Sequence, residues 1–283
     1  MARLTCQLAS ALLVAFAMCG NAYPAERVQF ESARYQIGPL QRRLALERRE
    51  PLIQPPASII DGFLTKPDGA GPFPAIVHLH GCSGLPDDVK RAANSLWSER
   101  LAAWGYAVLV VDSFRARGIS HTCLGQSAPR VADAYGALAW LARQPFVNAS
   151  RIAVIGFSAG GIAALSIAQA YDFELFEGEG EHTFKAAISF YPYCMPGNMM
   201  KMPTLVLIGE ADDWTPAAAC RAIEARGSEG NPVKLVVYPG AYHSFDSPRP
   251  GRRYFGHWLE YNRAAAEQAN EEVRVFLARH LPP

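Results

Sequence analysis

The stretch that most constrains the fold is RIAVIGFSAGG, from Arg151 to Gly161. An apolar run rich in isoleucine and valine, typical of a buried strand, ends in the pentapeptide 156–160, and a helix-prone segment follows. The pentapeptide matches G-x-S-x-G, in which a sharp strand-to-helix turn strains the serine backbone and small flanking residues let strand and helix pass closely. A glycine-rich turn can match by chance. The strand before it and the helix after it favour Ser158 as an exposed nucleophile.

Apolar strands alternate with helices along the rest of the chain. We predict strands at 58–64, 75–79, 107–111, 151–157, 186–191, 205–208 and 233–238, and helices at 89–104, 131–143, 161–170, 216–226 and 260–280. This alternation predicts the α/β class, with a mostly parallel central sheet and helices on both faces. An edge strand at 28–35, a charged solvent-facing stretch at 42–50 and an acidic surface loop at 174–182 complete the pattern. With no repeat or linker, we predict a single domain from 23 to 283.

The N-terminal residues resemble an export signal. Arg3 gives a positive start, and the apolar run 8–18 is too short to span a bilayer. Small residues then suit a cleavage site, so we predict that 1–22 form a signal peptide and that the mature protein is periplasmic or secreted. A lipoprotein signal ending at Cys19 is the alternative, which the bulky Met18 disfavours. No membrane span is expected once the signal is removed.

Export affects how the cysteines are interpreted. Two of the six leave with the signal, and Cys82, Cys123, Cys194 and Cys220 remain. An even number in an oxidising compartment indicates two disulfides, with four buried free thiols as the alternative. Each pair, Cys82 with Cys123 and Cys194 with Cys220, follows successive strands of the sheet and can meet within about 7 Å. We predict these two bridges, because crossed pairings would have to reach over Ser158.

Three predicted strands end in residues with complementary chemistry. Ser158 follows one strand, Asp212 and Asp213 follow a second, and His243 follows a third. The carboxyl ends of parallel strands meet at one edge of a sheet. There an imidazole can take the proton of a serine hydroxyl, and a carboxylate can fix the tautomer of that imidazole. Because the order Ser, Asp, His is that of α/β-hydrolases, a catalytic triad is favoured over a loop histidine and a turn-forming aspartate.

A developing oxyanion needs N–H donors near the nucleophile. The N–H of Ala159, at a helix N-terminus, is one candidate. The loop HGCSG at 80–84 follows an earlier strand, and we predict the N–H of Cys82 as the second donor. Cys82 as a nucleophile is the weaker alternative, since no elbow surrounds it. His78 and His80 lack further ligands at metal spacing, so we predict no metal, no cofactor and a structural role for His80.

Taken together, these motifs resemble the dienelactone hydrolase family of α/β-hydrolases. The matching segments are PFPA at 72–75 before HGCSG, VDSF at 111–114 followed by Arg-Gly, GFSAGG at 156–161, GEADDWTP at 209–216 and YHSFD at 242–246. The resemblance implies that Ser158 is the nucleophile, His243 the base, and Cys82 with Ala159 the oxyanion donors. In the family the acid lies four positions before a proline, which implies the first of the two adjacent aspartates, Asp212.

The chain also departs from the family pattern. The founding enzymes use a cysteine nucleophile that is switched on by a glutamate, in the loop where this chain has His80 and Gly81. This chain has a serine and lacks that glutamate, so the resemblance implies a general carboxylesterase. Related peptidases share the triad but carry a large extra domain for which this chain has no room.

The predicted function is hydrolysis of carboxylic esters or lactones through an acyl-enzyme. Acyl transfer to an alcohol by the same residues is one alternative, and a non-catalytic binding protein on a hydrolase scaffold is another, although such proteins commonly lack a triad member. With 27 basic and 26 acidic residues the net charge is +1. Such a balance gives no field that favours nucleic acid, so the expected partner is a small-molecule ester or lactone. The sequence makes no prediction of oligomeric state.

Candidate substrate-binding residues are two arginines and two aromatic residues. Arg115 and Arg117 follow Asp112 and can bind a substrate carboxylate or tie their own loop down, the interpretation that we slightly favour. Trp214 and Tyr191 can line the pocket, although large aromatic residues more often belong to the core.

Overall fold

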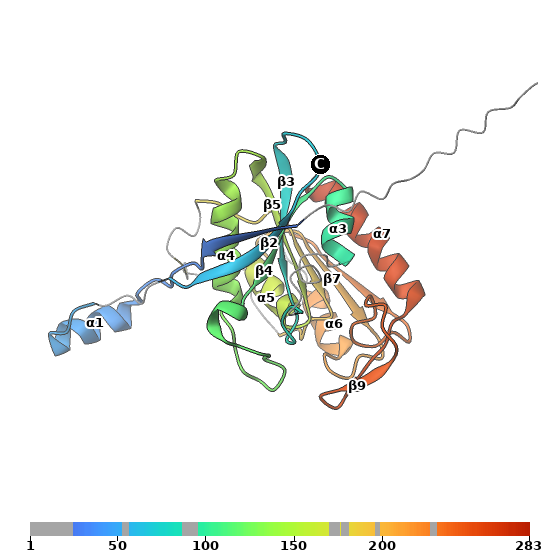
Figure 1. The fold of residues 1–283 in the computed structure, drawn as a ribbon. Coiled ribbons are helices and arrows are strands. Elements are labelled where there is room, and N and C mark those ends of the chain that lie inside the picture. The colour runs from blue at the N-terminus through green and yellow to red at the C-terminus, as the bar shows by residue number, and fades with distance from the viewer. Residues whose placement is uncertain are drawn as a thin grey trace, which may run out of the picture.

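A central β-sheet of eight strands organises the computed structural model (Figure 1). The structure describes residues 25–52, 57–86, 96–169, 176, 181–195, 199–226 and 231–283. Within these residues the strand order is β1-β2-β4-β3-β5-β6-β7-β8. The strands are β1 (Glu26–Glu31), β2 (Ile59–Thr65), β3 (Phe73–Leu79), β4 (Ala107–Asp112), β5 (Val147–Phe157), β6 (Ala187–Phe190), β7 (Thr204–Gly209) and β8 (Val233–Tyr238).

The strands from β3 to β8 run parallel, and β1 and β2 form an antiparallel edge beside β4. In the middle of the sheet, Ile76 of β3 pairs with Val108 of β4 on one side and with Ala153 of β5 on the other. All three side chains are fully buried, because helices cover both faces of the sheet here. The prediction of a mostly parallel sheet is confirmed.

Helices cover both faces of this sheet. They are α3 (Leu96–Ala103), α4 (Arg130–Ala142), α5 (Ala159–Ala168), α6 (Ala217–Arg226) and α7 (Arg263–His280). A short 3-10 helix η1 at Arg115–Arg117 follows β4, and α1 (Pro39–Arg48) projects away from the sheet in Figure 1. Figure 1 shows α4 and α5 on one side of the sheet and α3 and α7 on the other. Across the described residues, no helix combines the length and apolar character that a membrane crossing requires.

The N-terminal part of the described chain differs from the sequence predictions. The edge strand spans 26–31 rather than 28–35. The charged stretch 42–50 lies largely within α1, because its arginine, leucine, alanine and glutamate residues favour helix. The i,i+4 ion pair of Arg43 with Glu47 lies on the exposed surface of this helix.

Two further differences concern connections. A hairpin of β9 (Arg252–Tyr254) and β10 (His257–Leu259), which was not predicted from the sequence, lies before the last helix. The last helix therefore begins at Arg263 rather than at residue 260, with the side chain of Asn262 as its cap. Of the predicted helix 89–104, only α3 is described. Residues 1–22 and most of the acidic loop 174–182 lie outside the described residues.

Candidate active site

Ser158 stands on a sharp turn between β5 and α5. Its φ of 53° and ψ of −116° are strained for a residue with a side chain. Glycines make the turn possible: a Cβ on Gly156 would lie 2.0 Å from the carbonyl oxygen of Gly160, and one on Gly160 would lie 2.3 Å from that of Leu79. The backbones of β5, α5 and the end of β3 are therefore in direct contact, with no room for a side chain between them. Ser158 is partly exposed and lies at the carboxyl edge of the sheet.

Three side chains from distant parts of the chain form one hydrogen-bonded row. His243 Nε2 lies 3.0 Å from Ser158 Oγ, and His243 Nδ1 lies 2.7 Å from Asp212 Oδ2. The carboxylate holds the proton on Nδ1, which leaves Nε2 to accept from the serine hydroxyl. His243 and Asp212 are buried, so water does not compete for these bonds. The structure brings the three predicted residues together.

The two adjacent aspartates face different partners. Asp212 Oδ1 accepts hydrogen bonds of 2.9 Å from the N–H groups of Trp214 and Thr215, and the Thr215 hydroxyl donates to Oδ2 at 2.8 Å. These bonds fix the carboxylate against the imidazole. Asp213 instead lies with its half-exposed carboxylate 3.5 Å from His257 Nδ1. The geometry therefore places Asp212 in the triad row, as the proline spacing implied.

The loop that follows β3 places the peptide bond between Gly81 and Cys82 beside the serine. A Cβ on Gly81 would lie 3.6 Å from Ser158 Cβ. The Gly81 carbonyl accepts from His80 Nδ1 at 2.7 Å and from Arg130 Nη2 at 3.3 Å. Because C=O and N–H point in opposite directions across a trans peptide, these bonds turn the Cys82 N–H away from them. This orientation suits the predicted oxyanion donor.

His80 supports this loop as a neutral imidazole. The Ser113 N–H donates to its Nε2 at 3.3 Å, so the proton sits on Nδ1 and is donated to Gly81. Burial lowers the pKa of His80 to about 4, and burial lowers that of His78 to about 3. His78 stacks on Phe157 with ring centroids 4.9 Å apart. Both histidines are built into the protein interior, which agrees with the structural role predicted for His80.

Two disulfides lie near the carboxyl edge. Cys82 is joined to Cys123 and Cys194 to Cys220, with Cα atoms 4.9 and 5.0 Å apart, the pairing that the sequence predicts. The Thr122 N–H also donates to the Cys82 carbonyl at 2.8 Å. The first bridge therefore ties the loop that presents the Cys82 N–H to the segment after η1.

Mild reduction should lower esterase activity before it unfolds the protein. Cys123 is partly exposed whereas Cys194 and Cys220 are buried, so a reductant reaches the Cys82–Cys123 bridge first. Its loss frees the oxyanion loop while the core stays packed. Activity, far-UV circular dichroism and thiol alkylation followed across a dithiothreitol series check this expectation. Full activity in protein alkylated at Cys82 and Cys123 would contradict it.

The two arginines considered for substrate binding are occupied by the protein itself. Arg117 donates to both oxygens of the fully buried Asp133, at 2.7 and 3.0 Å, and to the Ser113 carbonyl at 2.8 Å. Arg115 donates to the Pro86 carbonyl at 3.2 Å, and its Nε lies 3.4 Å from a carboxylate oxygen of Asp112. Of the two interpretations, the structure favours the tying of this loop, because both guanidinium groups already have partners.

The two aromatic candidates both pack against the imidazole. The Tyr191 ring centroid lies 4.7 Å and the Trp214 centroid 5.0 Å from that of His243. Tyr191 is buried and its hydroxyl donates to Asp246 Oδ1 at 2.9 Å, so it supports the histidine rather than lining a pocket. Trp214 is half-buried and stacks on His257 of the hairpin at 4.8 Å.

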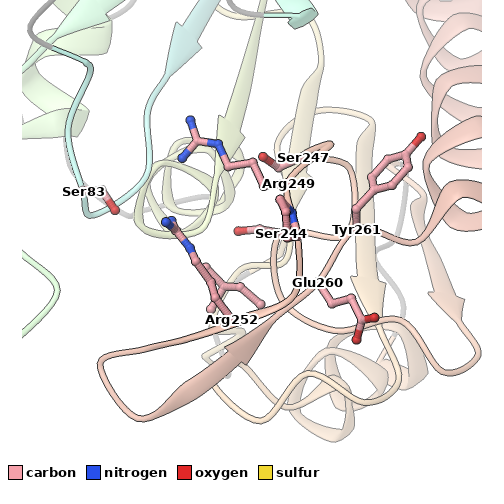
Figure 2. Close-up of a pocket in the computed structure, with 9 residues that line it drawn as sticks. Ser83, Ser244, Ser247, Arg249, Arg252, Glu260 and Tyr261 are labelled. Atoms are coloured by element: carbon pink, nitrogen blue, oxygen red, sulfur yellow. The ribbon is translucent and has the colours of Figure 1, made fainter.

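A pocket of about 120 Å³ adjoins this site (Figure 2). It is lined by Ser83, Ser244, Ser247, Arg249, Pro250, Arg252, Leu259, Glu260 and Tyr261. Ser83 follows Cys82, Ser244 follows His243, and Figure 2 shows the guanidinium groups of Arg249 and Arg252 on the side that faces Ser83. Within the described residues neither arginine is in a salt bridge. This pair was not among the predicted site residues, because the short hairpin that carries Arg252 has no readable sequence pattern.

The fold and the site together define a class of enzyme. A mostly parallel sheet carries a serine on a strand-to-helix elbow, followed in chain order by an acid and a histidine at later strand ends. This combination defines an α/β-hydrolase. Residues 60–281 match the family model described as the dienelactone hydrolase family. The chain belongs to this family, and it is a carboxylic ester hydrolase, as the sequence predicted.

Individual relatives agree with this assignment. A protein of Methylorubrum extorquens provisionally named carboxymethylenebutenolidase is 26% identical over 223 residues, which are 69% of this chain and 71% of that protein. Among solved structures, a dienelactone hydrolase-like promiscuous phosphotriesterase from metagenomic libraries has a TM-score of 0.62 and 21% identity, covering 90% of this chain and 98% of its own. A thermophilic esterase of Thermogutta terrifontis, solved with propionate bound, has a TM-score of 0.58 and 20% identity, covering 79% and 91%. These two likenesses show the fold.

Proposed function

We propose that the protein hydrolyses carboxylic esters or lactones with Ser158 as nucleophile, His243 as base and Asp212 as acid. The observation that carries this proposal is the continuous row from Asp212 through His243 to Ser158, with contacts of 2.7 and 3.0 Å in a buried setting. A serine on an elbow without such a row would be a poor nucleophile. Ser158 is also partly exposed, as a residue that attacks a substrate must be.

The geometry supports a two-step reaction. His243 Nε2 takes the proton of Ser158 as its oxygen attacks the ester carbonyl, and the N–H groups of Cys82 and Ala159 stabilise the resulting oxyanion. The tetrahedral intermediate collapses when the alcohol leaves with the proton from His243, and the acyl group stays on the serine. A water molecule, deprotonated by the same imidazole, then releases the carboxylic acid and restores Ser158.

A substrate series tests this function. Hydrolysis rates of p-nitrophenyl esters of increasing acyl length, together with one simple lactone, would define the acyl group that the site accepts. Product analysis with and without added alcohol separates hydrolysis from acyl transfer. Saturable, enzyme-dependent release of carboxylic acid is expected. No turnover of any ester or lactone by folded protein would contradict the proposal.

We further propose that the pocket beside His243 favours esters that carry a second, anionic group. Arg249 and Arg252 contribute two guanidinium groups to its lining, and Glu260 contributes the only acidic side chain among its described lining residues. The Glu260 carboxylate is engaged by the Trp258 indole N–H at 2.8 Å. Neither guanidinium is in a salt bridge among the described residues, and that of Arg252 lies over the Tyr254 ring, 5.1 Å from its centroid. Guanidinium groups bind carboxylates through paired, charge-assisted hydrogen bonds.

Replacing Arg249 and Arg252 together with glutamine should lower kcat/KM for an anionic ester about ten-fold or more, since charge-assisted hydrogen bonds are lost. The rate for its neutral counterpart should stay within about two-fold. Mono-p-nitrophenyl succinate against p-nitrophenyl butyrate places the charge on the acyl group. A second comparison, of acetoxybenzoate with its methyl ester, places the charge on the leaving group. Arg253→Gln, on the same strand, is the matched control. Equal losses for charged and neutral esters would contradict the proposal.

We propose that residues 1–22 are a signal peptide and that the mature protein is exported, with a single catalytic domain from 23 to 283. Two disulfides between four cysteines support an oxidising destination. Intact mass of the protein recovered from the periplasm or medium of an expressing bacterium tests this proposal, and a mature chain that begins at Tyr23 is expected. Full-length chain retained in the cytoplasm would contradict the proposal. Lipid on Cys19 would show instead that the protein is exported as a lipoprotein anchored to a membrane.

A further inference from the structure

A carboxylate outside the triad joins three segments of the protein behind His243. Asp246 lies three residues after the histidine and accepts hydrogen bonds from Tyr191 Oη at 2.9 Å and from Trp97 Nε1 at 2.8 Å. Tyr191 follows β6 and Trp97 belongs to α3. One side chain thus links the loop of His243 to the end of a central strand and to a covering helix.

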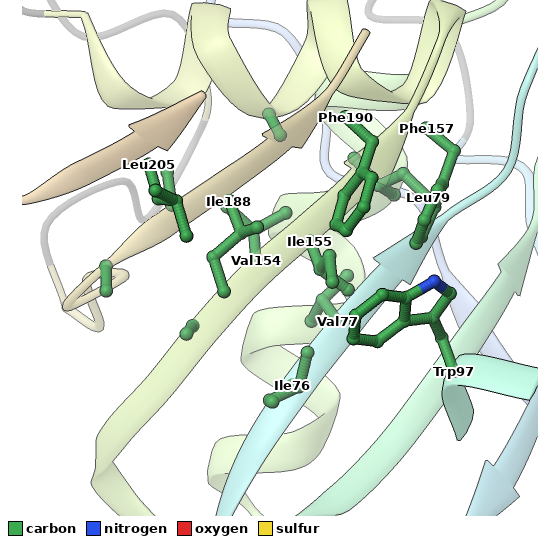
Figure 3. Close-up of a cluster of buried hydrophobic side chains, with 14 of the residues drawn as sticks. Ile76, Val77, Leu79, Trp97, Val154, Ile155, Phe157, Ile188, Phe190 and Leu205 are labelled. Atoms are coloured by element: carbon green, nitrogen blue, oxygen red, sulfur yellow. The ribbon is translucent and has the colours of Figure 1, made fainter. Parts of the chain in front are cut away.

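This carboxylate is partly buried, and the Trp97 ring that binds it belongs to the hydrophobic core. The Trp97 ring packs against Phe157 and Phe190, at centroid distances of 6.1 and 5.0 Å, within the cluster drawn in Figure 3. Burial raises the pKa of the Asp246 carboxyl, and the hydrogen bonds from Trp97 and Tyr191 oppose that rise. A carboxylate is costly in such a place unless its hydrogen bonds are made. Both of its oxygens have such a bond here.

Tyr191 transmits the position of Asp246 to the triad in two ways. Its ring centroid lies 4.7 Å from that of His243. Its carbonyl oxygen lies 3.1 Å from the oxygen of the Thr215 hydroxyl, which donates to Asp212 Oδ2 at 2.8 Å and lies 3.3 Å from His243 Nδ1. Tyr191 also has a φ of 37°, a strained conformation that surrounding contacts must hold.

We propose that Asp246 is a positioning residue: through its hydrogen bond to Tyr191 it holds the imidazole of His243 in line between Asp212 and Ser158. The inference rests on the proposed function, because it assigns His243 the role of base. The imidazole must keep its place while it takes up a proton and gives it back. Displacements of about 1 Å in such a site can cost about 100-fold in rate.

Tyr191→Phe tests this link with the smallest change, since it removes one hydroxyl and keeps the ring. The kcat for a p-nitrophenyl ester should fall about ten-fold while KM stays within about two-fold, because imidazole alignment affects the chemical step more than substrate binding. Tyr238→Phe is the matched control. Its ring packs on Phe245 at 4.9 Å, but its buried hydroxyl has no hydrogen-bond partner among the described residues. Its kcat should be unchanged.

A double-mutant cycle separates positioning from general stability. If Asp246 acts through Tyr191, then Asp246→Ala combined with Tyr191→Phe should lose little more kcat than Asp246→Ala alone. The melting temperature of each variant is measured beside its kinetics. Should Asp246→Ala fail to fold, the comparison of Tyr191→Phe with Tyr238→Phe still decides.

Wild-type kcat in Tyr191→Phe, with or without a lower melting temperature, would overturn the inference and leave Asp246 a purely structural residue. Its failure is distinguishable from failure of the proposed function. If Ser158→Ala is inactive and Tyr191→Phe is fully active, the positioning role alone is wrong. If Ser158→Ala retains activity, the proposed function fails first.

Discussion

Replacing Ser158 with alanine should lower kcat/KM for p-nitrophenyl esters by at least about 10³-fold, and up to about 10⁶-fold, because it removes the attacking atom. The melting temperature should change little. The elbow is set by the close contacts of Gly156 and Gly160, and alanine is no more strained than serine at a φ of 53°. Residual hydrolysis should come only from the oxyanion donors and substrate binding. Initial rates, with circular dichroism as the check on folding, measure the effect.

Ser166→Ala is a suitable control for this variant. Ser166 lies on α5, the helix that begins directly after Ser158. Its hydroxyl donates to the Ile162 carbonyl at 2.9 Å rather than to the triad. Its turnover should remain close to that of the unmodified protein. Near-normal turnover by folded Ser158→Ala would show that another group is the nucleophile, and the proposed mechanism would then be withdrawn.

The second large effect is expected at Asp212. Asp212→Asn should lower kcat about 10⁴-fold, because the amide favours the tautomer with the proton on Nε2, which cannot accept from the serine. Asp213→Asn should stay within about three-fold, since the Asp213 carboxylate lies 3.5 Å from the surface residue His257. Kinetics of the two variants, measured side by side with one ester, give the comparison.

The pair of variants differs by one position, so the result is unambiguous. A larger loss in Asp213→Asn would mean that the acid is the second aspartate and that the hydrogen bond of 2.7 Å between Asp212 and His243 has another role. Equal and small losses would mean that the imidazole works without a carboxylate partner.

The sequence was sufficient to predict the triad row and the sheet that carries it. Ser158, Asp212 and His243 each end a strand, and a parallel sheet brings strand ends to one edge whatever lies between them. The buried runs of β3 to β7 were recognisable because both faces of the sheet are covered. The two cysteine pairs followed from the same argument, since their loops lie at that edge.

The residues that support and surround the triad could not be predicted from the sequence. Asp246 bonds to Trp97 across 149 residues, and no local pattern marks such a contact. The strands of the hairpin are only three residues long, too short for a readable alternation, so the placement of Arg252 was missed. The sequence left both a substrate-binding and a loop-tying role open for Arg117, because its buried partner Asp133 lies on α4 and only the packed structure reveals that pair.

Covalent labelling of the nucleophile tests the proposed mechanism. A fluorophosphonate or an organophosphate ester reacts with an activated serine and leaves a stable adduct, which peptide mass spectrometry locates. We expect one adduct, on Ser158, that forms with loss of activity, is absent from Ser158→Ala and is strongly slowed in Asp212→Asn. Complete inactivation with the adduct on any other residue, or full labelling with activity unchanged, would contradict it.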